Sequence, residues 1–283
     1  MMDQYGGLEK QYTQYELSPI VILPVPYDGT STWIKGADKG PEAILAASEN
    51  MELYDIETDS EIYRKGIHTL NPIVHDGDPE TLADKVEHKI DSLLDDNKFS
   101  ITIGGEHSVS IGAFRSVTKK FNDISILQLD AHADLRQEYE QSRYNHACVM
   151  ARAKELAPIV QVGIRSMSAE EKNNMDPARI LFSHQIKQHP EWKQQVSGLL
   201  TGNVYITIDL DVLDPSIMPS TGTPEPDGLL YNDILDLIKL INSHHNIVGF
   251  DVVELCPGTN KAPDFLAAKI IYQILSLKFS LSK

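Results

Sequence analysis

The sequence contains very few cysteines. Its 283 residues include only Cys148 and Cys256, which stand far apart and in no metal-ligand spacing. A disulfide framework needs several paired cysteines, and a zinc knuckle needs closely spaced ones. The composition therefore indicates neither class and fits a protein of the reducing cytoplasm.

A long hydrophobic run is also missing. Residues 1–18 are polar and acidic without the apolar segment of a secretory signal. No stretch approaches the roughly 18 apolar residues of a membrane span. We expect a soluble, cytoplasmic protein, and because hydrophobic residues make up 41% of the chain, a single domain over residues 1–283.

Basic residues are scarce relative to acidic ones. The 25 Lys and Arg residues against 41 Asp and Glu residues give a net charge of -16. Such a charge repels nucleic acid and anionic membranes, so we expect neither as a partner. A small cationic molecule would be tolerated better. Net charge alone is also explained by an acidic surface that only aids solubility, although part of the acid could hold metal.

What the sequence does contain is a regular alternation of strand-like and helix-like segments. Short apolar runs followed by turn residues predict buried strands over residues 20–23, 100–103, 124–129, 159–162, 204–208 and 247–253. Amphipathic stretches predict helices over residues 41–53, 79–94, 108–120, 192–200, 231–242 and 264–277. We therefore predict an α/β fold, a single-domain three-layer α/β/α sandwich with a mostly parallel sheet. Sites in such folds lie beyond the carboxyl ends of the strands.

Three of these strands end in clusters of His and Asp. If strand geometry persists, alternation places the three polar side chains of DAHAD at 130–134 on one face, and both carboxylates of DLD at 209–211 together. In GGEH at 104–107, the glycines let the backbone turn closely beneath the histidine at a helix start. Six candidate metal ligands result: His107, Asp130, His132, Asp134, Asp209 and Asp211.

The crowding of four carboxylates predicts bound cations. Four such groups at the end of a buried sheet would repel one another strongly, and two divalent cations would cancel that charge. Oxygen and imidazole ligands suit ions such as Mn²⁺, and bridging carboxylates would hold two ions about 3.5 Å apart. Alternatively, Asp130 and Asp209 are helix-capping or turn residues, and His107 and His132 are core histidines. That alternative explains each residue alone better than it explains all six at strand ends.

Together the clusters resemble the signatures of the ureohydrolases, the family of arginases and agmatinases. The matching segments are GGEHS at 104–108, DAHAD at 130–134 and DLDVLDP at 209–215, and the similarity runs from residues 26–28 to 249–254. The resemblance implies an arginase-like fold, two Mn²⁺ per subunit with Ni²⁺ or another divalent ion as alternatives, and a homo-oligomer, either trimer or hexamer. It implies one metal on His107, Asp130, Asp134 and Asp209 and another on Asp130, His132, Asp209 and Asp211, with Asp130 and Asp209 bridging.

The same resemblance implies roles for three groups in cutting a guanidino group. Guanidinium is a resonance-stabilised, poor electrophile, and metals would make hydroxide available to attack it. Glu254 matches the family's guanidinium-binding glutamate. Asp134 would give a proton to the departing amine, and His146 would be the proton shuttle. By position alone, Glu254 could be an ordinary strand-end acid and His146 an exposed loop histidine.

Three departures from the arginase pattern favour a substrate without an α-carboxylate. Arginases bind that carboxylate through an Asn and a Ser/Thr-rich segment, but residues 136–140 read RQEYE here. Residues 163–165 (GIR) are followed by Ser166, Met167 and Ser168, where the family has its acid for the α-amino group. Residues 221–226 (TGTPEP) resemble the agmatinase form of this loop. The resemblance therefore predicts agmatine, cut to putrescine and urea.

The residues that hold the substrate tail are less well defined. Glu138 or Glu140 could meet the distal ammonium of agmatine, although both are equally compatible with a solvated charged loop. Arg136 would favour a carboxylate-bearing substrate if it faced the site. Guanidinobutyrase, guanidinopropionase, guanidine hydrolase and arginase therefore stay open, as does a non-catalytic metal- or polyamine-binding homologue. A metallophosphoesterase is disfavoured, because its Asn-His metal motif and phosphate-binding basic residues are missing.

Overall fold

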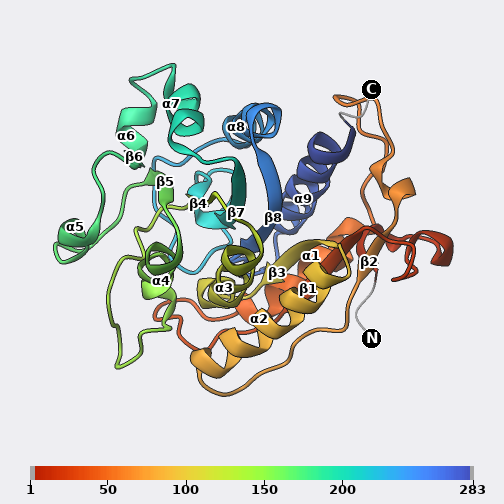
Figure 1. Cartoon of the computed structure of the whole chain (residues 1–283), viewed down its shortest axis with the longest axis horizontal. Coiled ribbons are helices and arrows are strands. Elements are labelled where there is room, and N and C mark those ends of the chain that lie inside the picture. The colour runs from red at the N-terminus through yellow and green to blue at the C-terminus, as the bar shows by residue number, and fades with distance from the viewer. Residues whose placement is uncertain (1–3, 281–283) are drawn as a thin grey trace.

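One sheet of eight strands organises the computed structural model, which describes residues 4–280 (Figure 1). The strands are β1 (Ile20–Val25), β2 (Ile67–Thr69), β3 (Phe99–Gly104), β4 (Ile124–Leu129), β5 (Ile159–Ile164), β6 (Ile180–Phe182), β7 (Asn203–Asp209) and β8 (Asn246–Val253). Their spatial order is β2-β1-β3-β8-β7-β4-β5-β6, and every pairing is parallel. All carboxyl ends therefore meet at one edge.

The helices cover both faces of this sheet. They are α1 (Gly40–Ser48), α2 (Pro79–Asp95), α3 (Ser110–Lys120), α4 (Val149–Leu156), α5 (Glu171–Asn174), α6 (Ser183–Ile186), α7 (Trp192–Leu199), α8 (Tyr231–His244) and α9 (Ala262–Ser280). Helices α1, α7, α8 and α9 pack on one face, and α2, α3 and α4 pack on the other. None of the helices within residues 4–280 combines the length and apolar character needed to cross a membrane.

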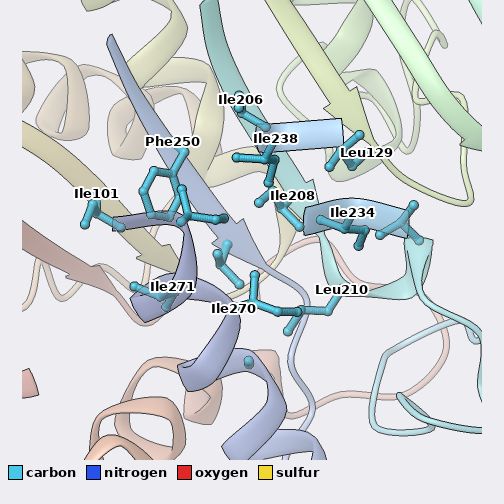
Figure 2. Close-up of a cluster of buried hydrophobic side chains, with 14 of the residues drawn as sticks. Ile101, Leu129, Ile206, Ile208, Leu210, Ile234, Ile238, Phe250, Ile270 and Ile271 are labelled. Carbon is cyan, nitrogen blue, oxygen red and sulfur yellow. The ribbon is translucent and has the colours of Figure 1, made fainter. Parts of the chain in front are cut away.

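The alternation of side chains along the strands explains the two cores. In β1, Ile20 and Ile22 join one buried cluster, whereas Val21 and Leu23 join the other. Figure 2 shows part of the first cluster, which includes Phe250 of β8, Ile206 of β7 and Ile271 of α9. Leu210 belongs to the same cluster and lies directly after β7. Its burial anchors the turn that follows this strand.

The predicted fold class is confirmed, with differences in detail. Strands β2 and β6 have three residues each and were not predicted, because so short a segment shows no clear alternation. Helix α4 and the one-turn helices α5 and α6 were also missed. Helix α1 ends at Ser48 rather than residue 53, since the next backbone N–H groups form tight turns to Ala47 and Ser48.

Candidate metal centre and active site

The candidate residues follow four strands that are neighbours at the centre of the sheet. These strands lie in the order β3-β8-β7-β4. His107 follows β3, Glu254 follows β8, Asp209 ends β7, and the DAHAD segment follows β4. Because all four strands are parallel, their carboxyl ends bring these segments together, as open α/β sheets do at their ligand sites.

The local geometry after β4 agrees with the expected alternation only in part. His132 forms an isolated parallel bridge with Ser166, and Ala131 and Ala133 are fully buried, so the extended form continues past the strand. At Asp134 the backbone turns to φ 52°, a left-handed value that non-glycine residues seldom adopt. Asp134 is therefore aimed by a chain reversal rather than by the strand period.

After β7 the strand geometry does not persist, although the two carboxylates lie together as expected. Leu210–Val212 forms a short 3-10 helix, not a continuing strand, and the side chain of Asp209 accepts a hydrogen bond from the backbone N–H of Asp211 at 2.8 Å. Asp209 thus caps this turn, as its alternative role proposed. Both carboxylates are nevertheless buried and face the same site.

The glycines before His107 allow a close backbone approach, as the sequence predicted. A Cβ atom on Gly105 would lie 1.9 Å from the carbonyl oxygen of Tyr27. The chain then enters a 3-10 helix at His107–Val109 before α3 begins. Only glycine can bring β3 and the segment after β1 this close together, which fixes the position of His107.

His107 points at three carboxylates. Its Nδ1 lies 3.1 Å from Asp134 Oδ2, 3.2 Å from Asp130 Oδ2 and 3.4 Å from Asp209 Oδ2. This nitrogen is buried and has no hydrogen-bond partner of acceptable geometry within the described chain. A buried polar atom so placed needs either a proton or a cation.

The other ring nitrogen of His107 indicates how the ring is protonated. Nε2 lies 2.9 Å from the hydroxyl of Thr207, which donates its hydrogen at 2.6 Å to the buried carboxylate of Asp251. Since that hydrogen is used, Nε2–H must donate to the hydroxyl oxygen. In the neutral ring, the lone pair is then on Nδ1, which faces the three carboxylates, as in a metal-binding histidine whose other nitrogen has a fixed partner.

A second group of ligands adjoins the first. Asp130, His132 and Asp211 can together hold an ion, and His132 Nδ1 lies 2.8 Å from Asp211 Oδ2 and 3.7 Å from Asp130 Oδ1. His107, Asp130 and Asp134 form the other such group. Asp130 belongs to both groups, the position of a bridging ligand.

The electrostatics of the cluster reflect excess negative charge. Burial and the neighbouring Asp211 and Asp134 raise the pKa of Asp130 to about 7. Burial, with Asp211 and Asp130 nearby, raises the pKa of Asp209 well above its usual value. Burial would lower the pKa of His107, but the surrounding carboxylates raise it well above normal. Without cations, protons must therefore neutralise the cluster.

These observations fit two divalent cations. The lone pair on His107 Nδ1, the shared Asp130 and the mutually repelling carboxylates are all accommodated if cations replace the protons. Imidazole nitrogen and carboxylate oxygen form the donor set, with no thiolate among them, which suits ions such as Mn²⁺. Five of the six predicted ligands belong to the two ligand groups, and the sixth, Asp209, lies beside His107 but belongs to neither group.

A cavity of about 190 Å³ opens beside the ligands. Its wall includes the other predicted catalytic residues, Glu254 and His146, together with Arg136. Glu254 is buried in a left-handed conformation (φ 68°), and burial, together with the nearby Glu106, raises its pKa well above normal. A bound cation such as guanidinium would relieve this penalty.

The predicted tail-binding acids do not lie on this wall. Glu138 and Glu140 are exposed and absent from the cavity lining, because the chain after Arg136 turns back on itself through a bridge between Tyr139 and Ser142. The geometry does not support a contact between either acid and a substrate in the cavity. Arg136 does face the cavity, but its guanidinium stacks on Tyr139 and its Nε lies 4.0 Å from Glu171 Oε2.

Sequence reasoning missed two groups near the site. Glu171 is buried at the cavity wall and accepts hydrogen bonds from the backbone N–H groups of Leu135 and Ser168. Residues 166–168, which lie on the same wall, contain no acid, so Glu171 supplies the carboxylate there. Thr30, in the loop after β1, contacts His146 and Glu106. Its place after a parallel strand was the only signal that could have revealed it.

Comparison with known proteins identifies the family. The protein-family model described as "Arginase family" matches residues 18–276 of this chain. The chain belongs to the arginase family. This assignment agrees with the ligand clusters, and the protein is therefore a metal-dependent amidino hydrolase of the ureohydrolase type.

Individual arginase-family relatives show comparable similarity. The N(1)-aminopropylagmatine ureohydrolase of a Synechocystis species is 33% identical, over 93% of this chain and 90% of its own length. An agmatinase of Halalkalibacterium halodurans is 32% identical, over 93% of both chains. The crystal structure of an agmatine ureohydrolase of Thermoplasma volcanium, 31% identical, superposes with a TM-score of 0.89 over 99% of this chain and 95% of its own.

Proposed function

We propose that this protein hydrolyses the guanidino group of agmatine, releasing urea and putrescine. The observation that supports this choice of substrate is that the guanidinium of Arg136 is already in contact with neighbouring side chains. Arg136 is the only Lys or Arg among the described residues that line the cavity, and Glu171 and Tyr139 already engage its guanidinium. Among the described residues that line the cavity, no other cation could hold an α-carboxylate, and residues 136–140 also lack the Asn and Ser/Thr-rich segment that bind this group in arginases, so a decarboxylated substrate fits best.

The residues beside the cavity divide the chemistry among them. Glu254 would pair with the guanidinium through a charge-assisted hydrogen bond and hold its carbon near the ligand cluster. When bound by the six ligands, two divalent cations would lower the pKa of water and so supply hydroxide at neutral pH. Asp134 would pass a proton to the departing amine, and His146 would exchange protons with solvent.

A second candidate substrate is N(1)-aminopropylagmatine. The Synechocystis relative is named for it, and its identity to this chain is about the same as that of the named agmatinase. This compound carries an additional amine, which would meet an acidic surface: Glu171 lines the cavity, and Glu225 Oε1 lies 3.9 Å from His132 Nε2 with the glutamate about one-third exposed. Both candidates share the guanidino end and differ only in the tail.

A substrate panel tests the proposal. Mn²⁺-loaded protein is incubated with agmatine, N(1)-aminopropylagmatine, arginine and 4-guanidinobutyrate, and urea and the amine product are both identified by mass spectrometry. We expect the highest kcat/KM with agmatine and no turnover of arginine. A higher kcat/KM with the aminopropyl compound would replace agmatine as the substrate, and preferential cleavage of either carboxylate-bearing compound would overturn the proposal.

The remaining properties are proposed on the family resemblance. We propose Mn²⁺ as the metal, a homo-oligomer of three or six subunits, a single domain over residues 1–283, and a cytoplasmic role in polyamine synthesis. Metal analysis of protein purified without added metal tests the first property. Light scattering coupled to gel filtration tests the second.

A further inference from the structure

Thr30 connects His146 to a buried carboxylate behind the cavity wall. Its Oγ1 lies 3.0 Å from Glu106 Oε2, 3.0 Å from His146 Nδ1 and 2.9 Å from the backbone nitrogen of His146. Glu106 is completely buried and also accepts hydrogen bonds from the backbone N–H and the hydroxyl of Ser108. Thr30 itself does not line the cavity.

The hydrogen bonds of this hydroxyl can be counted completely. A threonine hydroxyl has one hydrogen to donate and two lone pairs to accept with. The carboxylate of Glu106 is the stronger of the two available acceptors, so it takes the hydrogen. Two lone pairs then face two nitrogens of His146, and one of these, the backbone amide, can only donate. The second lone pair is satisfied only if Nδ1 also carries a hydrogen.

The hydrogen bonds of the Thr30 hydroxyl determine which ring nitrogen of His146 carries a hydrogen. We propose that Thr30 is a positioning residue that holds the neutral His146 as its Nδ1–H tautomer and so leaves the lone pair on Nε2. Nε2 has no partner among residues 4–280, and His146 forms part of the cavity wall. The proton-exchanging atom is thereby fixed as Nε2. This inference rests on the proposed function, in which His146 moves protons.

His107 has the same arrangement as His146, but with the two ring nitrogens exchanged. Thr207 donates to Asp251 and accepts from Nε2–H of His107, which leaves Nδ1 for a metal. Thr30 donates to Glu106 and accepts from Nδ1–H of His146, which leaves Nε2. In each case a threonine hydroxyl, oriented by a buried carboxylate, selects which imidazole nitrogen keeps its lone pair.

Two substitutions separate this role from simple packing. T30V keeps the side-chain shape and removes the hydroxyl, and T30S keeps the hydroxyl. We expect T30V to lower kcat roughly 10- to 100-fold, part of the usual contribution of a positioned proton-transfer group, with KM changed less than about threefold. T30S should recover most of the loss. T118V, which removes a hydroxyl bonded only within α3, is the matched control and should keep full activity.

Nitrogen NMR provides a readout that does not require turnover. In ¹⁵N-histidine-labelled protein loaded with diamagnetic Mg²⁺, the signals of His146 are assigned by their loss in H146Q. For neutral His146, we expect a protonated Nδ1 and an unprotonated Nε2 in the wild type and in T30S. In T30V, we expect the tautomers to mix or reverse.

The outcomes are distinguishable. A protonated Nε2 in the wild type, or T30V with unchanged kcat and unchanged ¹⁵N signals, overturns the inference. If T30V does not fold, the wild-type tautomer and the T30S kinetics still decide. If no guanidino compound is hydrolysed but Nδ1–H is found, the tautomer assignment is supported and the proposed function is not.

Discussion

The backbone N–H of His107 donates a hydrogen bond of 2.8 Å to Oε1 of Glu254. The two residues lie 147 positions apart in sequence, but they follow the neighbouring strands β3 and β8. The bond fixes one oxygen of the carboxylate relative to a candidate metal ligand and leaves Oε2 for a substrate. The sheet itself thus sets the distance between Glu254, the proposed guanidinium ligand, and the candidate metal ligands.

Removing the charge of Glu254 should lower kcat/KM without lowering the metal content of the protein. In E254Q, an amide replaces the carboxylate, so the charge-assisted pair with guanidinium is lost at a cost of about 1.5–3 kcal/mol, or roughly 10- to 100-fold in kcat/KM. The amide oxygen can still accept from His107. Steady-state kinetics with metal analysis checks this, with the exposed Glu16→Gln as the matched control. Activity within about twofold of the wild type would remove Glu254 from the substrate site.

Substitution of Glu171 should affect agmatine binding more than substitution of Glu138 or Glu140, the two acids that the sequence suggested for the substrate tail. Glu171 lies on the cavity wall, whereas Glu138 and Glu140 are exposed outside it. E171Q should raise KM for agmatine several-fold, because it weakens the negative field and releases Arg136, while E138Q and E140Q should each change KM less than about twofold. Initial rates over a range of agmatine concentrations measure this. A larger effect at Glu138 or Glu140 would restore the sequence-based assignment.

The fold and the ligand cluster could be predicted from sequence because both depend on local patterns. Apolar runs marked six strands, and polar residues at their ends marked the candidate ligands. The tail-binding acids could not be predicted in the same way. Glu138 was chosen because it follows the ligands in sequence, but the bridge between Tyr139 and Ser142 turns the loop away from the cavity. Glu171 reaches the wall from beyond β5, and nothing in the sequence indicates that path.

Thr207, whose hydroxyl is hydrogen-bonded to Nε2 of His107, should affect the affinity for metal. T207V removes the hydroxyl that accepts from Nε2–H and so frees the ring to rotate or change tautomer. Loss of such a partner typically weakens metal binding about 10- to 100-fold. Competition with a chelator of known affinity measures the dissociation constant, and T207S should restore it. If T207V binds Mn²⁺ as tightly as the wild type, the hydroxyl does not orient His107.

Metal uptake should depend on pH in a defined direction. Burial and neighbouring carboxylates raise the pKa of Asp130 to about 7, so in the metal-free protein this group holds a proton below that pH. The cation must displace the proton, and affinity should therefore fall as the pH is lowered through about 7. Isothermal titration in buffers of different ionisation enthalpy should show net proton release on Mn²⁺ binding near pH 6. Binding without proton release would contradict the raised pKa.

The close approach beneath His107 should make Gly105 difficult to replace. In G105A, the new Cβ would lie 1.9 Å from the carbonyl oxygen of Tyr27, so β3 and the segment after β1 must separate. Overpacking of this kind costs about 1–3 kcal/mol or more, and the displacement should also weaken metal binding, because His107 follows directly. Gly198 in α7 is the matched control, since a Cβ there meets nothing within 4 Å. There the same change should stabilise the protein by about 0.5–1 kcal/mol, because alanine favours helix more than glycine does. Urea unfolding gives the free energy of unfolding of the wild type and of both variants. If G105A is as stable as the wild type, the backbone at Gly105 can relax without cost.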